Sequence, residues 1–340
     1  MKAQDRVKRL LGSPWLKWAV VVIAVAVGAY EIVEKWHGVQ HGLTQIGLVG
    51  ALYALLALFG MQFATLRTWQ VLLAGLGSPL QTRTAGQILF VGQLGKYIPG
   101  SVFAVLAQME LGARANVPRT RSASASILTM LLSLLTGLLV AAVTLPFVQG
   151  SSQYLWVFAV VPVVIVCLYP KVLNPLLNKL FTLAKRPPLD RPVTGRMLLH
   201  ALAWSLTAWL FNGLQIWLLA DKFGAPVGKT ILVSLGGYAF AWCVGFVFLP
   251  APAGAGIRDP LIVASLAPVI GSNPALAVML VSRAVNTISD LLVAGTAMVA
   301  ARQLRRSDAT EKAEETVSAE TVSPVSSVSD TAPSASSTAT

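Results

Sequence analysis

Charged residues are scarce in this chain of 340 residues: they make up 12% of it, whereas hydrophobic residues make up 55%. A water-soluble protein carries about 25% charged residues to hydrate its surface, so these proportions argue against a soluble globular fold. The apolar residues fall in blocks of about 17 to 25, the length that a helix needs to cross the hydrocarbon core of a bilayer. The sequence therefore predicts a polytopic membrane protein.

Acidic residues are rarer still, since only eight precede Ser307. The chain has no aspartate-rich cluster, Gly-x-Ser-x-Gly, P-loop or His-Glu-x-x-His motif, so we expect no enzymatic activity, no catalytic residue and no cofactor. No metal is expected either, because His37 and His41 have a ligand spacing without other ligands nearby. The only cysteines, Cys167 and Cys243, lie far apart in apolar blocks and are interpreted as packing residues.

The formal charge of +12 does not indicate nucleic-acid binding, because the basic residues lie between apolar blocks and are not interleaved with aromatic residues. Each apolar block is expected to be helical, since only helices satisfy their own backbone groups in lipid without closing into a barrel. The expected fold is all-α. The blocks run at about 15–33, 46–66, 85–111, 127–148, 154–169, 197–219, 230–249, 261–270 and 274–301.

The positions of Lys and Arg predict the orientation, because cytoplasmic loops retain basic residues. Nineteen of them lie at the N-terminus, in alternate loops and after the last block, against three in the remaining loops. We expect a basic cytoplasmic N-terminus over 1–14 and a transmembrane domain over 15–303. The segment 304–340, rich in Ser, Thr, Ala and acidic residues, is expected to be a disordered cytoplasmic tail.

Two blocks cannot then be simple spans. Arg83 and Arg114 both lie inside, so 85–111 must enter and leave on the cytoplasmic side, with its break at the Tyr-Ile-Pro-Gly of 97–100. The same argument applies to 230–270, which must begin and end on the outer side of the membrane. It predicts a second hairpin from the opposite face, broken by the Pro/Gly-rich 249–256, although 230–249 is long enough to cross fully. About six full spans remain, and the two weakly similar hairpins are typical of an inverted-repeat transporter.

The few charges at membrane depth are the candidate functional residues, because an ionised group there is costly. Lys96 beside the first break is either a snorkelling lysine or a cation for a lipid phosphate. Arg258 beside the second break suits a phosphate, and Asp259 is either a helix cap or part of that site. Arg283, Asn286, Thr287 and Asp290 share one helix face, as an interhelical lock or as the border of a substrate path. Glu110 completes the set of charges at membrane depth.

The sequence around both breaks resembles the lysylphosphatidylglycerol synthase transmembrane-region family, the membrane part of the bacterial multiple peptide resistance factor. The resemblance covers roughly 15–302 and rests on 95–100 with 112–114, and on 249–259 with 277–283. It assigns Asp259 to a position where the family usually has Glu. The other positions that match the family's motifs and last helix are Tyr97, Pro99, Gly100, Pro250, Gly254, Gly256, Arg258 and Arg283.

The resemblance implies lipid translocation without lipid synthesis, since the chain lacks the cytosolic aminoacyl transferase domain. We expect a bacterial inner-membrane flippase for an anionic phospholipid or a polyprenyl-phosphate-linked precursor, with Lys96, Arg258 and Arg283 compensating the phosphate. Expected partners are membrane lipids and envelope-biosynthesis enzymes. The alternative is a non-catalytic scaffold of an envelope glycosyltransferase. A small-solute permease would need a more polar lumen. Cargo, energy source and oligomeric state stay open.

Overall fold

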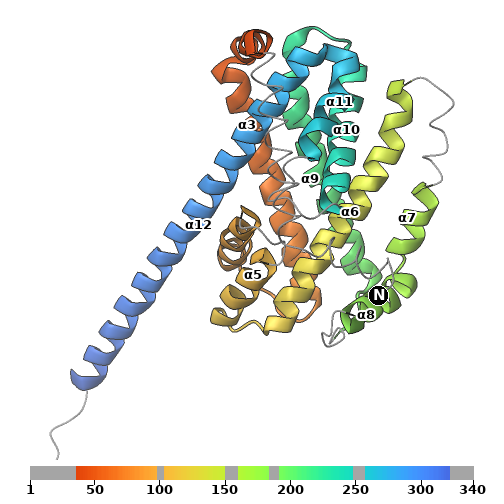
Figure 1. The fold of residues 1–340 in the computed structure, drawn as a ribbon. Coiled ribbons are helices and arrows are strands. Elements are labelled where there is room, and N and C mark those ends of the chain that lie inside the picture. The colour runs from red at the N-terminus through yellow and green to blue at the C-terminus, as the bar shows by residue number, and fades with distance from the viewer. Residues whose placement is uncertain (1–35, 98–102, 150–159, 184–190, 248–256, 322–340) are drawn as a thin grey trace, which may run out of the picture. The chain divides into compact units, whose positions relative to one another are not determined.

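The computed structural model describes residues 36–97, 103–149, 160–183, 191–247 and 257–321, with side chains as far as residue 300. All regular elements in these ranges are helical, which confirms the all-α prediction (Figure 1). The chain divides into two units, Met1–Met298 and Val299–Thr340. The second is helical up to Thr321, past the boundary near residue 304 that the composition predicts.

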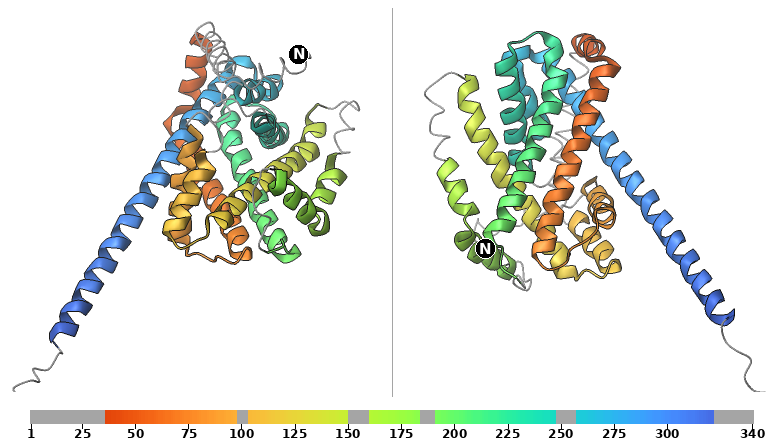
Figure 2. Two further views of the ribbon diagram at one scale, coloured as in Figure 1. Left: turned by 60° about the horizontal axis from the view of Figure 1, so that its bottom comes forward. Right: turned by 180° about the vertical axis from the view of Figure 1, so that it is seen from behind.

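The described part of the chain contains ten α-helical segments and short 3₁₀ or π-helical turns between some of them. They are α3 (Trp36–Gly75), α4 (Thr82–Gly86), the π-helical turn η1 (Gln87–Val91), the 3₁₀ turn η2 (Leu94–Tyr97), α5 (Phe103–Arg114), α6 (Arg119–Gln149), α7 (Val160–Leu168), α8 (Pro170–Leu183), α9 (Gly195–Ala220), the 3₁₀ turn η4 (Asp221–Phe223), α10 (Val227–Val247), α11 (Arg258–Ile270) and α12 (Ser272–Thr321). In the first unit α3 lies along α9, and α10 packs against α6, α9 and α11 (Figure 2).

Among the described residues, five helices are long and apolar enough to cross a membrane, or six if the bent pair α7 and α8 forms one span, which makes this a multi-pass membrane protein. They cover Gln40–Gly75, Arg119–Phe147, Gly195–Phe223, Val227–Val247 and Ser272–Ala300. Four correspond to predicted full spans, and the fifth is α10, the segment whose depth the sequence leaves open. The predicted first span, 15–33, lies outside the described residues.

The first predicted hairpin has two short arms that run antiparallel. Its first arm comprises α4, η1 and η2, its second arm is α5, and both are shorter than the roughly 20 residues of a span. A Cβ on Gly95 would lie 2.7 Å from the backbone of Ala104, and Gln108 donates to the Leu89 carbonyl at 3.4 Å, so the arms touch along their length. This arrangement agrees with a hairpin that enters and leaves on one side.

Arg121 holds the two ends of this hairpin at the same end of the bundle. Its guanidinium, at the start of α6, donates to the Gly77 carbonyl at 3.0 Å and to Ser78 Oγ at 3.2 Å. Gly77 has a positive φ of 91°, a conformation that favours glycine, and this turn ends α3 just before α4. The end of α3 and the start of α6 are thus adjacent.

The second predicted hairpin is formed by α10 and α11, which also run antiparallel. A Cβ on Gly237 would lie 2.6 Å from Ser265 Cβ, and one on Gly245 would lie 3.1 Å from Arg258 Cβ. With 13 residues, α11 rises about 20 Å and cannot span, whereas the 21 residues of α10 rise about 30 Å. One arm is therefore long enough for a full crossing.

The predicted span 154–169 lies within the described residues only from residue 160 onward. Its described part is α7, and at Tyr169 the chain bends by 78° into α8, in a segment predicted to be cytoplasmic loop. The side chains of Leu173 and Leu177 are buried in the core, and Asn174 bonds the backbone N–H and C=O of Val193 at 2.8 and 3.0 Å. These contacts hold α8 against the bundle. The hydrophobic pattern of α7 gives no indication of them.

Gly137 lies where α6, α9 and α10 meet, and its lack of a side chain is needed there. A Cβ on it would lie 2.6 Å from Trp209 and 2.8 Å from Cys243 Sγ. Trp209 has little freedom to move, because its indole N–H donates to Thr136 Oγ1 at 3.0 Å and to the Ser133 carbonyl at 3.2 Å. The contact thus fixes how closely the three helices pack.

We expect Gly137→Ala to destabilise the protein by about 1–3 kcal/mol, the usual cost of overpacking a rigid core. Thermal unfolding in detergent micelles measures this as a lower melting temperature. Gly295→Ala is the matched control, because nothing lies within 4 Å of the Cβ that it adds within α12. Equal melting temperatures for the two variants would contradict the close approach.

Candidate functional site

A polar stripe runs along one face of α12 inside the first unit. As the spacing predicts, it contains Arg283, Asn286, Thr287 and Asp290. The two middle side chains bond within their own helix, Asn286 to the Ser282 carbonyl at 2.8 Å and Thr287 to the Arg283 carbonyl at 3.0 Å. The charged residues at the ends of the stripe instead reach other helices.

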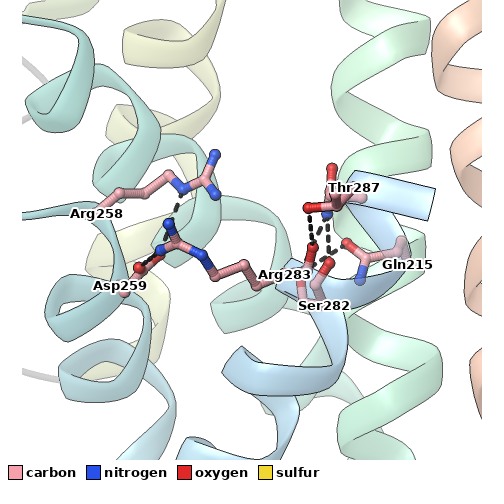
Figure 3. Close-up of polar contacts among 7 residues, drawn as sticks. Gln215, Arg258, Asp259, Ser282, Arg283 and Thr287 are labelled. Carbon is pink, nitrogen blue, oxygen red and sulfur yellow. Dashed lines mark hydrogen bonds and ion pairs between the residues drawn. The ribbon is translucent and has the colours of Figure 1, made fainter. Parts of the chain in front are cut away.

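At the N-terminal end of the stripe, Arg283 Nη1 binds Asp259 Oδ2 of α11. Figure 3 shows the Arg283 guanidinium at this carboxylate, and Nε of Arg258, the residue before Asp259 on α11, lies 3.7 Å from Asp259 Oδ1. The side chains of Asp259 and Arg258 are 14% and 17% exposed. The second hairpin is therefore joined to α12 through the ion pair of Arg283 with Asp259, beside which Arg258 places a second cation.

Asp259 does not cap α11, which was one interpretation of its position. The N-cap residue is Ile257, no side chain bonds there, and Asp259 lies in the first turn. Its carboxylate is still favoured by the positive end of the helix dipole. Its binding partner, however, is the Arg283 guanidinium from the neighbouring helix.

At the other end of the stripe, Asp290 binds a lysine of the first hairpin. Lys96 Nζ, in η2, lies 2.6 Å from Asp290 Oδ2, and Gln62 Nε2 of α3 donates to Asp290 Oδ1 at 2.8 Å. The Asp290 side chain is 8% exposed and that of Lys96 is 38% exposed. Asp290 therefore pairs with Lys96 of the first hairpin.

Gln62 is a site residue that the sequence did not single out. It is a buried polar residue within an otherwise apolar span, which was the available signal. Its pairing with Asp290 joins positions 228 residues apart, and such a contact has no local periodicity.

Gln215 joins α9 to α12 through an interhelical hydrogen bond. Ser282 Oγ donates to Gln215 Oε1 at 3.4 Å, and Gln215 is fully buried (Figure 3). One turn earlier on α9, the buried side-chain oxygen Oδ1 of Asn212 has no hydrogen-bond partner in the part of the chain that the structure describes.

Taken together, the charges of the two clusters do not cancel. Lys96, Arg258 and Arg283 carry three positive charges, against the two negative charges of Asp259 and Asp290. The buried Arg258 Nε has no hydrogen-bond partner among the described residues. Seven residues of helix separate Arg283 from Asp290, which is a rise of about 10 Å along α12. The site thus has an excess of positive charge suited to an anion.

Glu110 does not belong to this site, although its position in an apolar block suggested membrane depth. Its side chain is 52% exposed and lies 2.9 Å from Arg119 and 3.7 Å from Arg114. The hydrogen bond and charge of Arg119 hold the pKa of Glu110 below its usual value. Glu110 therefore belongs to a surface group at the end of α5.

The remaining predicted site residues cannot be placed around these clusters. Tyr97 is described as backbone only, at the end of η2. Pro99, Gly100, Pro250, Gly254 and Gly256 lie outside the described residues. Within the described ranges no three His, Cys, Asp or Glu side chains come together as metal ligands would.

Comparison with known protein families gives one match for this chain. The model of the family described as "Lysylphosphatidylglycerol synthase TM region" matches residues 10–294. The matched range includes both hairpins, the α12 stripe and all five charged residues of the two clusters. No curated protein matches the sequence.

Proposed function

The chain belongs to the lysylphosphatidylglycerol synthase transmembrane-region family, and on this premise we propose that it moves an anionic phospholipid or a polyprenyl-phosphate-linked precursor between the two leaflets of a bilayer. The family links this membrane region to lipid handling. The observation that carries the proposal is the excess of positive charge in the two clusters, where Lys96, Arg258 and Arg283 face only the carboxylates Asp259 and Asp290. In this proposal the chain is a transporter and not an enzyme.

The three cations have distinct parts in binding a phosphate. Arg258 is mostly buried, its Nε donor has no hydrogen-bond partner among the described residues, and a guanidinium matches phosphate oxygens with two parallel N–H groups. Arg283 is 40% exposed, so a head group can reach it while Asp259 holds its side chain in place. Lys96 provides a compact positive charge from the opposite hairpin, and its side chain is also accessible.

The two carboxylates stabilise the cations of the site when no lipid is bound. An unpaired charge in the membrane interior costs several kcal/mol, and it is stabilised when an opposite charge lies beside it. Asp259 and Asp290 compensate Arg283 and Lys96 in this way when no lipid is bound. A phosphate that enters the site replaces part of this compensation, so binding exchanges one ion pair for another.

Reconstitution into vesicles tests the proposal directly. A phospholipid with a fluorescent acyl chain and an anionic head group is placed in both leaflets, and a membrane-impermeant reductant then destroys the fluorescence of the outer leaflet. We expect the purified protein to extend this loss to the inner-leaflet lipid, whereas protein-free vesicles keep it. If no anionic lipid is translocated, a scaffold for an envelope glycosyltransferase becomes the better explanation.

We further propose that the protein lies in the bacterial inner membrane with both termini in the cytoplasm, on the basis of its basic loops. Asn273, exposed in the first turn of α12, is then on the outer side of this membrane, and Gln81, exposed before α4, is cytoplasmic. In a Cys167→Ala/Cys243→Ala background, we expect Asn273→Cys to react with an impermeant maleimide in intact cells. Gln81→Cys should react only after lysis. Labelling of Asn273→Cys only after lysis would contradict the orientation of the second hairpin.

A further inference from the structure

The chain leaves the direction of a membrane span where α7 meets α8. α7 packs against the spanning helix α6, and its side chains Val163, Ile165 and Val166 are exposed, so it has a lipid-facing side. Tyr169, which follows α7, is also exposed, and tyrosine is enriched where spans meet the membrane–water interface. There the chain bends by 78°, so α8 runs almost at a right angle to α7 (Figure 1). This direction places α8 close to the plane of the membrane.

The apolar side of α8 is only partly covered by the protein. Leu173 and Leu177 are buried in the core of the bundle. Val172 and Leu176, one turn apart on the neighbouring face, are exposed instead. At 3.6 residues per turn the four side chains form one continuous apolar face. Its exposed half is suited to insertion among lipid acyl chains, as in helices that lie in the interface of a bilayer.

The polar side of α8 is positively charged. Lys171 and Lys179 are exposed, and none of the ion pairs between described residues involves them. The surrounding sequence adds no negative charge, because no Asp or Glu occurs between Glu110 and Asp190. A helix with lysines on its polar face and apolar residues on the other is typical of binding to an anionic bilayer surface.

α8 lies at the end of the bundle where α3 ends and α6 begins. Asn174 on α8 bonds the backbone of Val193, just before α9. A Cβ on Gly77, after α3, would lie 3.0 Å from the Arg191 guanidinium, and Arg121 of α6 donates to the Gly77 carbonyl. The proposed orientation makes this end cytoplasmic, and anionic lipids give the cytoplasmic leaflet a negative surface potential.

We propose that α8 is an interfacial helix that binds anionic phospholipids of the cytoplasmic leaflet. Val172 and Leu176 insert among the acyl chains, while Lys171 and Lys179 reach the phosphates of the head groups. The choice of leaflet rests on the proposed orientation, whereas the contact with a bilayer does not. This surface is separate from the two charged clusters, which contain no residue of α8. It enriches lipids of the class proposed as cargo beside the bundle.

Spin labels on two faces of α8 test its contact with the bilayer. Leu176→Cys and Thr182→Cys, both exposed positions, are labelled in a Cys167→Ala/Cys243→Ala background and reconstituted into vesicles with equal parts of phosphatidylcholine and phosphatidylglycerol. Oxygen concentrates in the hydrocarbon of these vesicles, whereas a nickel chelate stays in water. We expect the label at 176 to collide more often with oxygen and the label at 182 more often with the chelate. Equal access of the chelate to both labels would overturn the proposal.

Brominated lipids test the part of the lysines. A fluorophore on Leu176→Cys is quenched by brominated acyl chains beside it, so brominated phosphatidylglycerol and brominated phosphatidylcholine report which lipid α8 prefers. We expect Lys171→Gln/Lys179→Gln to lower the preference for phosphatidylglycerol at least about fivefold, equivalent to the about 1 kcal/mol of one basic residue at an anionic surface. Lys222→Gln/Lys229→Gln is the matched control, because these exposed lysines lie at the other end of α9.

A preference for phosphatidylglycerol that survives in Lys171→Gln/Lys179→Gln would overturn the assignment to these lysines. Where that variant does not fold, the labelled protein with both lysines decides, since its preference has to weaken at high salt. Neither measurement requires lipid translocation, so α8 can bind the bilayer even if the proposed function fails. Gln81→Cys lies at the same end of the bundle as α8, and its labelling in intact cells would overturn the assignment to the cytoplasmic leaflet alone.

Discussion

Replacing Arg258 and Arg283 together with alanine is expected to reduce translocation of an anionic phospholipid to the rate of protein-free vesicles. These residues provide two of the three cations at the stripe, and Arg258 has a buried donor that the described residues do not use. A charge-assisted hydrogen bond contributes about 1.5–3 kcal/mol, so each single substitution should lower the rate by about ten- to a hundredfold. The fluorescence assay in vesicles measures all three variants.

Loss of both arginines leaves Asp259 without its cations, so folding has to be checked separately. A variant that also carries Asp259→Asn removes the uncompensated carboxylate, and its elution and melting in detergent show whether the fold is kept. Arg67→Ala is the matched control, because Arg67 lies 5.7 Å from the Trp204 ring and takes no part in the stripe. Translocation that is unchanged in the folded double variant would contradict the assignment of the site.

Removing Lys96 is expected to destabilise the protein more than removing Asp290. Lys96→Met leaves behind a carboxylate that is 8% exposed, whereas Asp290→Leu leaves behind an ammonium that is 38% exposed and can reach water. Breaking a fully buried ion pair costs about 3–5 kcal/mol. Because Lys96 is partly solvated, we expect about 1–3 kcal/mol for Lys96→Met and less for Asp290→Leu.

The double variant Lys96→Met/Asp290→Leu should recover most of the stability lost in Lys96→Met, because an ion pair replaced by apolar groups leaves no uncompensated charge. Chemical unfolding of the four proteins in one detergent gives the coupling free energy of the pair. Additive losses in the double variant would show that the two side chains do not interact. A larger loss in Asp290→Leu than in Lys96→Met would contradict the argument from exposure.

The hydropathy of the sequence and the positions of its basic residues were sufficient to predict the helical fold and most of the spans. They also predicted two hairpins, because Arg83 and Arg114 lie on one side of the apolar block between them. The bend before α8 could not be predicted in this way, since it depends on Asn174 binding the backbone of Val193, 19 residues away. The hydropathy of α7 carries no information about that contact.

The composition of the stripe was predicted, but its pairings were not. The helical spacing shows that Arg283 and Asp290 share a face of the helix. It does not show which other helices approach that face. The structure brings Asp259 to the first and Lys96 to the second, so each hairpin has its own contact with α12. Gln62 joins the site across 228 residues, a distance over which a single sequence contains no pairing signal.

The selectivity of translocation tests the central claim most directly. Two fluorescent phospholipids with the same acyl chains, one with an anionic phosphoglycerol head group and one with a zwitterionic phosphocholine, are followed in parallel in vesicles that contain the wild-type protein. The excess of positive charge in the two clusters predicts that the anionic lipid crosses at least about tenfold faster, equivalent to about 1.4 kcal/mol. Equal rates for the two lipids, or no translocation above protein-free vesicles, would contradict the account.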